Sequence, residues 1–337
     1  MASETQTALG LNNMTSSALR DFYPRLAKLH AAPLWEVLGE IVGAQPHPAA
    51  IPALWKYDEL RPFLMEAGEL ITAREAERRV LMLENPGFPG GSRIAQSVYA
   101  GLQLVLPGEF TSSHRHVAAA LRFIIEGEGA YTAVDGERVS MHPGDLILTP
   151  SWTFHDHGNP GDSPVVWFDG LDIPLVNFFD SSFAEHLPDE GTQPSVHSSA
   201  PAFAFPYAPA REALRNKSLQ NKSVHPCHGA KIEYRNAKGA SVTPTLGAFL
   251  QSLPAGFKGA PYRSTDSTVY CVAEGSGTSR IGDRLFEWTA RDIFVVPSWC
   301  SVAHQAEEHS ILFSFSDRPA QKALGLWREQ PAEVRPA

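Results

Sequence analysis

Three histidines, His114, His116 and His155, have the residue type and the spacing of a metal site. One residue separates His114 from His116, and alternate residues of a β-strand project to the same face of a sheet. His155 comes from a strand end much later in the chain and completes a face of three nitrogen ligands. Imidazole binds iron, copper, zinc and nickel, so the ligand type alone leaves the identity of the metal open.

Glycines and a proline flank these histidines at fixed distances. The two patterns are Gly108-x5-His114-x-His116 with Gly127 downstream, and Gly144-x5-Pro150-x4-His155-x3-Asn159. They resemble the two signature motifs of the cupin family, small antiparallel β-barrels that hold a metal inside. One alternative is that the three histidines are unrelated, and their joint spacing with the glycines and proline argues against it. A second alternative is a metal site that performs no chemistry.

One position departs from the cupin pattern. Most cupins place a metal-binding glutamate shortly after the paired histidines, and this chain has Ala120 there. Three neutral ligands would leave three positions of a six-coordinate ion open and its charge unbalanced. A substrate that chelates through a carboxylate and a phenolate would fill two positions and supply the missing charge. The third would remain for O₂.

The chain contains an internal repeat. Gly108 and Gly127 correspond to Gly256 and Gly275, because each pair is 19 residues apart. The segment GDLILTPSW in the first repeat likewise corresponds to RDIFVVPSW in the second. Self-similarity at this period indicates a duplicated domain rather than a solenoid.

The second repeat lacks the ligands of the first. At the three ligand positions it carries Tyr262, Ser264 and Val302, and its His304 aligns with His157. The sequence therefore predicts one metal site in the chain, and a second barrel that packs and assembles.

Periodicity divides the chain into four parts. Residues 1–91 read as a helical N-terminal region and arm, and residues 92–182 as a first barrel of short strands with the metal site. Residues 183–240, rich in Pro, Ser, His and Asn, read as a linker, and residues 241–337 as the second barrel. The predicted fold class is mainly β, with two antiparallel β-barrels.

Composition limits the partners and the compartment. The net charge of −9 disfavours nucleic acid and anionic membranes. The three cysteines have no short paired spacing, which fits a reducing environment. The first residues lack the pattern of a signal peptide, and no apolar run has the length of a membrane span. We therefore expect a cytoplasmic protein.

Several further residues are candidates for the pocket. Arg122 has the same strand parity as His114 and His116, so an unbroken strand would aim its guanidinium into the barrel, where an anion must balance it. The alternative is an internal ion pair with Glu126 or Asp145. His157 shares the strand face of His155 and is a candidate hydrogen-bond partner or proton carrier.

Three weaker candidates lie on other predicted strands. Asp169 ends the strand VVWFD, from which it could orient His157 or accept a phenolic proton. Gln103 and Tyr99 share parity on SVYAGLQLVL and could line the same cavity. A purely structural role is the alternative for each of them.

The stretch from HRHVAAALRF through PSWTFHDHGN to DGLDIP resembles the gentisate 1,2-dioxygenase family and its salicylate- and 1-hydroxy-2-naphthoate-cleaving relatives. The likeness extends to PLWEVLG, ERRVLMLENPG and DIFVVPSW. The resemblance implies a bicupin enzyme, commonly a homotetramer, that holds Fe²⁺ on the three histidines. It would cleave gentisate with O₂ between the carboxyl-bearing and hydroxyl-bearing carbons to give maleylpyruvate, in aromatic-compound catabolism.

Carried over residue by residue, the resemblance implies substrate-pocket roles for Arg122, Gln103, His157, Asp169 and, from the ERR segment, Arg78. Tyr99 stands where salicylate-cleaving relatives have tryptophan, which favours gentisate over salicylate or 1-hydroxy-2-naphthoate. Two readings of other classes stay open: a non-catalytic bicupin that binds an aromatic acid, and a metal-dependent isomerase or hydrolase, for which zinc would serve.

Overall fold

The structure, a computed structural model, describes residues 17–188, 191–220 and 225–331. The chain divides into two compact units, residues 1–47 and 48–337. Among its described residues, the first unit consists of a helix over residues 17–27 and α2 (Leu34–Ile41). The first helix runs through Pro24 in one segment, and Pro33 caps α2 in an extended conformation. The expected N-terminal helices are confirmed.

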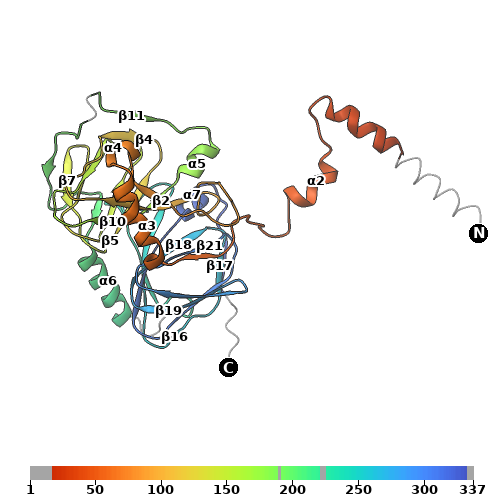
Figure 1. Ribbon diagram of the computed structural model, residues 1–337. Coiled ribbons are helices and arrows are strands. Elements are labelled where there is room, and N and C mark those ends of the chain that lie inside the picture. Colours follow the sequence, from red (N-terminus) through yellow and green to blue (C-terminus); the bar gives the residue numbers. More distant parts are fainter. Residues whose placement is uncertain (1–16, 189–190, 221–224, 332–337) are drawn as a thin grey trace, which may run out of the picture. The chain divides into compact units, whose positions relative to one another are not determined.

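In the second unit, the first repeat forms two sheets of six strands each (Figure 1). The sheet with the longer strands is called the larger sheet, and the other the smaller sheet. The larger has the order β13 (Ala204–Phe205), β8 (Leu146–Thr149), β5 (Ala120–Glu126), β10 (Val165–Leu171), β3 (Tyr99–Val105) and β2 (Val80–Met82). The smaller has the order β11 (Ala184–His186), β4 (His114–His116), β9 (His155–Gly158), β6 (Tyr131–Val134), β7 (Glu137–Ser140) and β12 (Val196–His197).

The second repeat has the same plan. Its larger sheet has the order β1 (Ala53–Trp55), β21 (Ile293–Val296), β18 (Thr268–Glu274), β23 (Ser310–Ser316), β15 (Gly247–Leu253) and β14 (Ala230–Glu233). Its smaller sheet has the order β20 (Arg284–Thr289), β19 (Ser276–Ile281), β22 (Val302–Ala306), β17 (Tyr262–Ser264) and β24 (Glu329–Pro331), and β16 (Phe257–Lys258) also pairs with β22.

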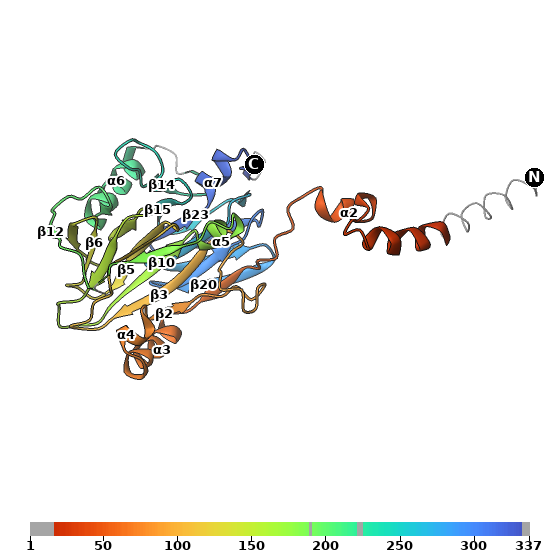
Figure 2. The same cartoon turned by 90° about the horizontal axis from the view of Figure 1, so that it is seen from above.

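Helices cover the outer faces of the larger sheets. α3 (Tyr57–Leu70) packs against β3, and α6 (Tyr207–Gln220) against β14 and β15 (Figure 2). The remaining helices of this unit are short: α4 (Ala73–Ala76), α5 (Ile173–Phe178) and α7 (Arg318–Ala323). Within the described part of the chain, no helix combines the length and the hydropathy that crossing a lipid bilayer demands.

The two repeats meet through their larger sheets. β5 and β10 are buried at six successive positions, because one face lines a barrel interior and the other packs on the second repeat. At this contact the rings of Phe123 and Phe313 stack with centroids 4.2 Å apart, and Phe168 lies 5.5 Å from Phe315. One apolar core therefore continues from one repeat into the other.

The backbone confirms the internal repeat. Gly127 and Gly275 adopt left-handed φ angles of 85° and 84°, and Trp152 and Trp299 adopt 62° and 60°. A tryptophan rarely takes this conformation, so its occurrence at both equivalent positions marks a shared turn geometry. The predicted fold class, two antiparallel barrels, is confirmed.

The segment between the repeats is more regular than its composition indicates. Residues 183–240 contain β11, β12 and β13, which join sheets of the first repeat, as well as α6 and β14. Three of these strands have only two or three residues, too few to display the alternation that identifies a strand in a sequence. The domain boundaries that we predict within the second unit remain a prediction.

Candidate metal centre

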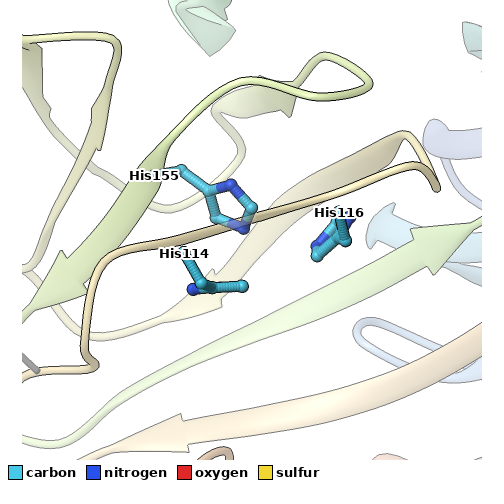
Figure 3. Close-up of side chains that lie close together, drawn as sticks. All are labelled: His114, His116 and His155. Carbon is cyan, nitrogen blue, oxygen red and sulfur yellow. The ribbon is translucent and has the colours of Figure 1, made fainter. Parts of the chain in front are cut away.

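His114, His116 and His155 come together on the smaller sheet of the first repeat. β4 and β9 are antiparallel neighbours, and His114 lies directly opposite His155 in their register. One ring nitrogen from each histidine lies within 4.8 Å of the others. Figure 3 shows the three side chains turned toward one another from the two strands. The predicted group of three histidines is therefore assembled.

The backbone fixes which nitrogen of each ring is available. His114 Nδ1 lies 3.0 Å from the Ser112 carbonyl oxygen, and His155 Nδ1 lies 3.0 Å from that of Thr153. His116 Nδ1 makes the same contact with Ala118, at 2.7 Å. A carbonyl oxygen only accepts hydrogen bonds, so each Nδ1 carries the proton and each Nε2 presents a lone pair.

Burial keeps these imidazoles neutral. It lowers the pKa of His114 to about 3, with the positive charge of Arg78 as the second cause, and the pKa of His116 to about 4. Burial likewise holds the pKa of His155 well below its ordinary value. A metal ion binds the deprotonated ring, so the site requires no proton release near neutral pH.

The donor set fits a divalent transition metal. Nε2 of His155 is buried and has no hydrogen-bond partner within the described residues, as expected of an atom directed at an ion. The cluster of potential ligands found in the described part of the chain contains histidines only, and Ala120 provides no carboxylate. An ion held here would keep its full positive charge and three open positions of an octahedron.

A cavity of about 490 Å³ opens beside His116. Five predicted pocket residues line it: Arg78, Tyr99, Gln103, Arg122 and Asp169. Of these five, Tyr99, Gln103, Arg122 and Asp169 belong to strands of the larger sheet, which faces the histidines across the barrel. The sequence analysis missed several members of the apolar wall, namely Val80, Ala118, Leu171, Ile173, Phe183 and Ala184. For Leu171 the sequence did contain a signal, because this residue continues the strand pattern of β10.

Arg122 reaches the cavity by a different route from the one expected. The strand of the histidines ends at His116, and Arg122 lies on β5, which belongs to the other sheet. Strand parity counted from His116 was therefore the wrong argument, because the chain turns at residues 117–119. The expected competitor Glu126 pairs instead with Arg61, at 2.7 Å.

The anion beside Arg122 is Asp169. Arg122 Nε lies 3.4 Å from Asp169 Oδ1, and the two residues are directly opposite in the β5–β10 register. Trp167 Nε1 donates to the other carboxylate oxygen at 3.1 Å. Burial raises the pKa of Asp169 to about 6, although the charge of Arg122 acts in the opposite direction. The carboxyl can thus change its protonation state near neutral pH.

His157 is buried beside the three histidines. Its ring centroid lies 5.7 Å from that of His155 and 5.5 Å from Trp167. Nδ1 of His157 makes a 2.9 Å hydrogen bond with Thr132 Oγ1, so Thr132 rather than Asp169 orients this ring. Its Nε2 has no partner within the described residues, and burial holds its pKa well below the ordinary value.

A turn between α4 and β2 places Arg78. Glu77 adopts a left-handed φ of 52°, which reverses the chain after α4. Arg78 Nη2 then contacts Nε2 of His114, the nitrogen that would face an ion, whereas Arg79 is bound to Glu109, at 2.7 Å, and to the Ile71 carbonyl. Of the two neighbouring arginines, Arg78 is the one at the cavity.

Residues 101–173 match a family model described as a cupin domain. The chain is 49% identical to gentisate 1,2 dioxygenase 1 from Aquipseudomonas alcaligenes, over 92% of this chain and 95% of that protein. The chain belongs to the gentisate 1,2-dioxygenase family. The predicted resemblance is confirmed.

Members of the gentisate 1,2-dioxygenase family carry the names of different substrates. A 5-aminosalicylate 1,2-dioxygenase from Comamonas sp is 34% identical, over 90% of this chain and 88% of that one. The salicylate 1,2-dioxygenase of Pseudoaminobacter salicylatoxidans, solved as a tryptophan-to-tyrosine variant in complex with gentisate, is 36% identical. It superposes with a TM-score of 0.87 over 94% of this chain and 95% of that one.

Proposed function

We propose that this chain is an Fe²⁺-dependent ring-cleaving dioxygenase that converts gentisate and O₂ to maleylpyruvate. One observation carries the proposal: the cavity that contains the buried Arg122–Asp169 pair is also lined by His116, one member of the group of three neutral imidazoles. The first element suits a metal with open positions, and the second suits an anionic hydroxylated ligand. The identity to gentisate 1,2 dioxygenase 1 supports the choice of substrate.

The protein groups would bind and orient the substrate. Arg122 would hold its carboxylate through the planar guanidinium fork, and Arg78 would add a second positive charge. Gln103 and Tyr99 would fix the ring from β3. A ferrous ion, when bound by the three histidines, supplies open coordination positions and redox chemistry toward O₂.

Proton handling would fall to Asp169 and His157. Asp169 lies at the cavity wall with a pKa near neutrality, so its carboxylate could accept a phenolic proton. His157 is neutral, and its Nε2 is free of a partner among the described residues. It would serve as a hydrogen-bond partner beside the metal.

The test is oxygen uptake by the Fe²⁺-loaded protein with gentisate, together with the near-ultraviolet absorbance of maleylpyruvate. We expect one O₂ consumed per gentisate, and turnover of salicylate at most about one-hundredth as efficient, a difference of nearly 3 kcal/mol. No uptake despite bound iron would overturn the proposal and leave a non-catalytic bicupin. Turnover of gentisate without oxygen consumption would indicate the isomerase or hydrolase class.

Salicylate or 1-hydroxy-2-naphthoate is the second candidate substrate. The superposition on salicylate 1,2-dioxygenase favours it, because the two chains share their fold almost throughout. Uptake with salicylate but little with gentisate would move the chain to that activity.

Activity should depend on the protonation of Asp169. If its carboxylate accepts the phenolic proton, kcat/KM rises with pH through about 6, because the carboxyl is protonated below that value and cannot accept. We expect Asp169→Asn to be slower and to lose this acidic limb. The measurement is kcat/KM between pH 5 and 8, at roughly half-unit steps. An unchanged limb in the variant would assign it to another group.

We further propose a homotetramer, as the resemblance implies, and a cytoplasmic location, for which the cysteines are the support. Cys271 and Cys300 form no disulfide within the described residues, which fits a reducing compartment.

A further inference from the structure

The interior of the second barrel contains polar atoms that the proposed function does not use. Gln251 and Ser314 are both fully buried, and neither the amide of Gln251 nor the hydroxyl of Ser314 has a hydrogen-bond partner within the described residues. His304 is in the same state at Nε2, while its Nδ1 lies 2.7 Å from Ser279 Oγ. Such atoms are costly unless a ligand or water satisfies them.

These positions repeat the architecture of the first pocket. Gln251 on β15 corresponds to Gln103 on β3, and the Ser279–His304 contact repeats the contact of His157 with Thr132. The metal ligands are absent, so the second barrel has lost the metal site but has kept a polar interior. That combination points to binding without metal chemistry.

A cavity of about 580 Å³ lies beside this interior, between β14, β15 and α7, whose labels lie close together in Figure 2. Lys231 on β14 lines it and is directly opposite Gln251 in the β14–β15 register, so both side chains face the same side of the sheet. Phe249 supplies apolar surface, and Arg318 at the start of α7 supplies a second cation.

Most charges around this cavity are already paired. Arg318 lies 3.2 Å from Asp266, and Arg235 lies 2.5 Å from Glu233. Two lysines differ: Lys217 Nζ donates to the Lys231 carbonyl oxygen, and the ammonium of Lys231 has no carboxylate within ion-pair distance in the described ranges. Its Nζ lies 4.5 Å from the Phe249 ring centroid, and the Arg318 guanidinium lies 5.3 Å from the same ring.

Lys231 and Arg318 both lie above the Phe249 ring. The carboxylates of Asp266 and Glu233 are paired with Arg318 and Arg235, so no ion pair balances the charge of Lys231 within the described ranges. Burial, followed by the nearby charge of Arg318, lowers the pKa of Lys231 to about 7. A bound carboxylate would supply the missing partner and favour the charged ammonium. The apolar surface beside it would accommodate the body of an organic acid rather than a bare inorganic ion.

We propose that the second barrel binds a small aromatic carboxylic acid, with its carboxylate at Lys231 and Arg318 and its ring beside Phe249. This site is separate from the metal centre and requires no metal. It gives the second barrel a ligand of its own.

The test counts benzoate molecules bound to the full-length, metal-loaded protein by isothermal titration calorimetry. We expect two per chain in the unchanged protein, one in Lys231→Met, and two in the matched control Lys258→Gln. Lys258 is an exposed lysine on β16 and does not line the cavity. An equal number of benzoate molecules bound to Lys231→Met and to the unchanged protein would overturn the proposal.

A second measurement needs no variant and so does not depend on the folding of Lys231→Met. Amine labelling followed by peptide mass spectrometry compares Lys231 with Lys258 in the unchanged protein. Benzoate at about ten times its Kd should slow labelling of Lys231 roughly tenfold and leave Lys258 unaffected. Equal labelling with and without benzoate would refute the site, and equal protection by inorganic phosphate would show an adventitious ion only.

These outcomes are distinct from those of the proposed function. Loss of gentisate turnover or of the benzoate molecule at the metal centre bears on the first barrel. Loss of the Lys231-dependent molecule bears on the second barrel alone.

Discussion

His155→Ala should bind no measurable iron and should lose turnover. His155 provides one of three nitrogens, and its Nε2 is the one that is buried without a partner in the described part of the chain. Two remaining imidazoles cannot hold the ion against solvent and competing chelators. Because the metal supplies several kcal/mol of catalysis, the loss of activity should reach at least about a thousandfold. Metal analysis and an oxygen electrode measure the two effects.

The matched control for this substitution is His197→Ala. His197 is an exposed histidine on β12 in the same sheet, outside the group of three. It should keep both iron and activity. Full turnover by His155→Ala in an iron-free state would contradict the assignment of the metal centre, and so would loss of iron from the control.

Arg122→Met should lower kcat/KM for gentisate by about a hundredfold to a thousandfold, because removing one partner of a buried charge pair costs roughly 3–4 kcal/mol. The substitution removes the guanidinium that would hold the substrate carboxylate. It also leaves the Asp169 carboxylate beside a thioether, where its ionised form is poorly solvated. The iron content should remain unchanged, since no metal ligand is altered.

Three further variants separate binding from folding. Arg122→Lys keeps the charge without the planar fork and should fall between the parent and Arg122→Met. Arg122→Met combined with Asp169→Asn should recover melting temperature but not activity, because no uncompensated charge remains buried. Arg138→Met, an exposed arginine on β7, should behave as the parent. A parent-like kcat/KM in Arg122→Met would refute the carboxylate clamp.

The metal centre could be predicted from the sequence because its geometry is local. His114 and His116 belong to one short strand, and their hydrogen-bond acceptors lie two residues away in the chain. The left-handed glycines that shape the surrounding turns, such as Gly144 with a φ of 88°, are also visible as glycines. Residue type and spacing in the sequence are therefore enough to predict most of the metal centre.

The Arg122–Asp169 pair could not be predicted in the same way. It depends on the register of β5 against β10, two strands that are distant in sequence, and no pattern in the sequence specifies which residues face each other. The ion pairs considered as the alternative for Arg122, with Glu126 or Asp145, were accordingly wrong, and the role of Arg122 toward a substrate carboxylate stays a prediction. The short strands of residues 183–240 were missed because a pair such as Val196–His197 is held by its neighbour β7 rather than by a local preference.

In the first barrel, the predicted metal ligands and the polar residues of the cavity lie on opposite walls. The three histidines that would hold a metal belong to β4 and β9 of the smaller sheet, each with its imidazole hydrogen-bonded to nearby backbone, whereas Tyr99, Gln103, Arg122 and Asp169 belong to the larger sheet. Replacing a residue of the larger sheet alters the shape and polarity offered to an aromatic ring without moving a ligand. A change of preferred aromatic acid would therefore require substitutions on one wall only, and the three histidines on the other wall could stay as they are.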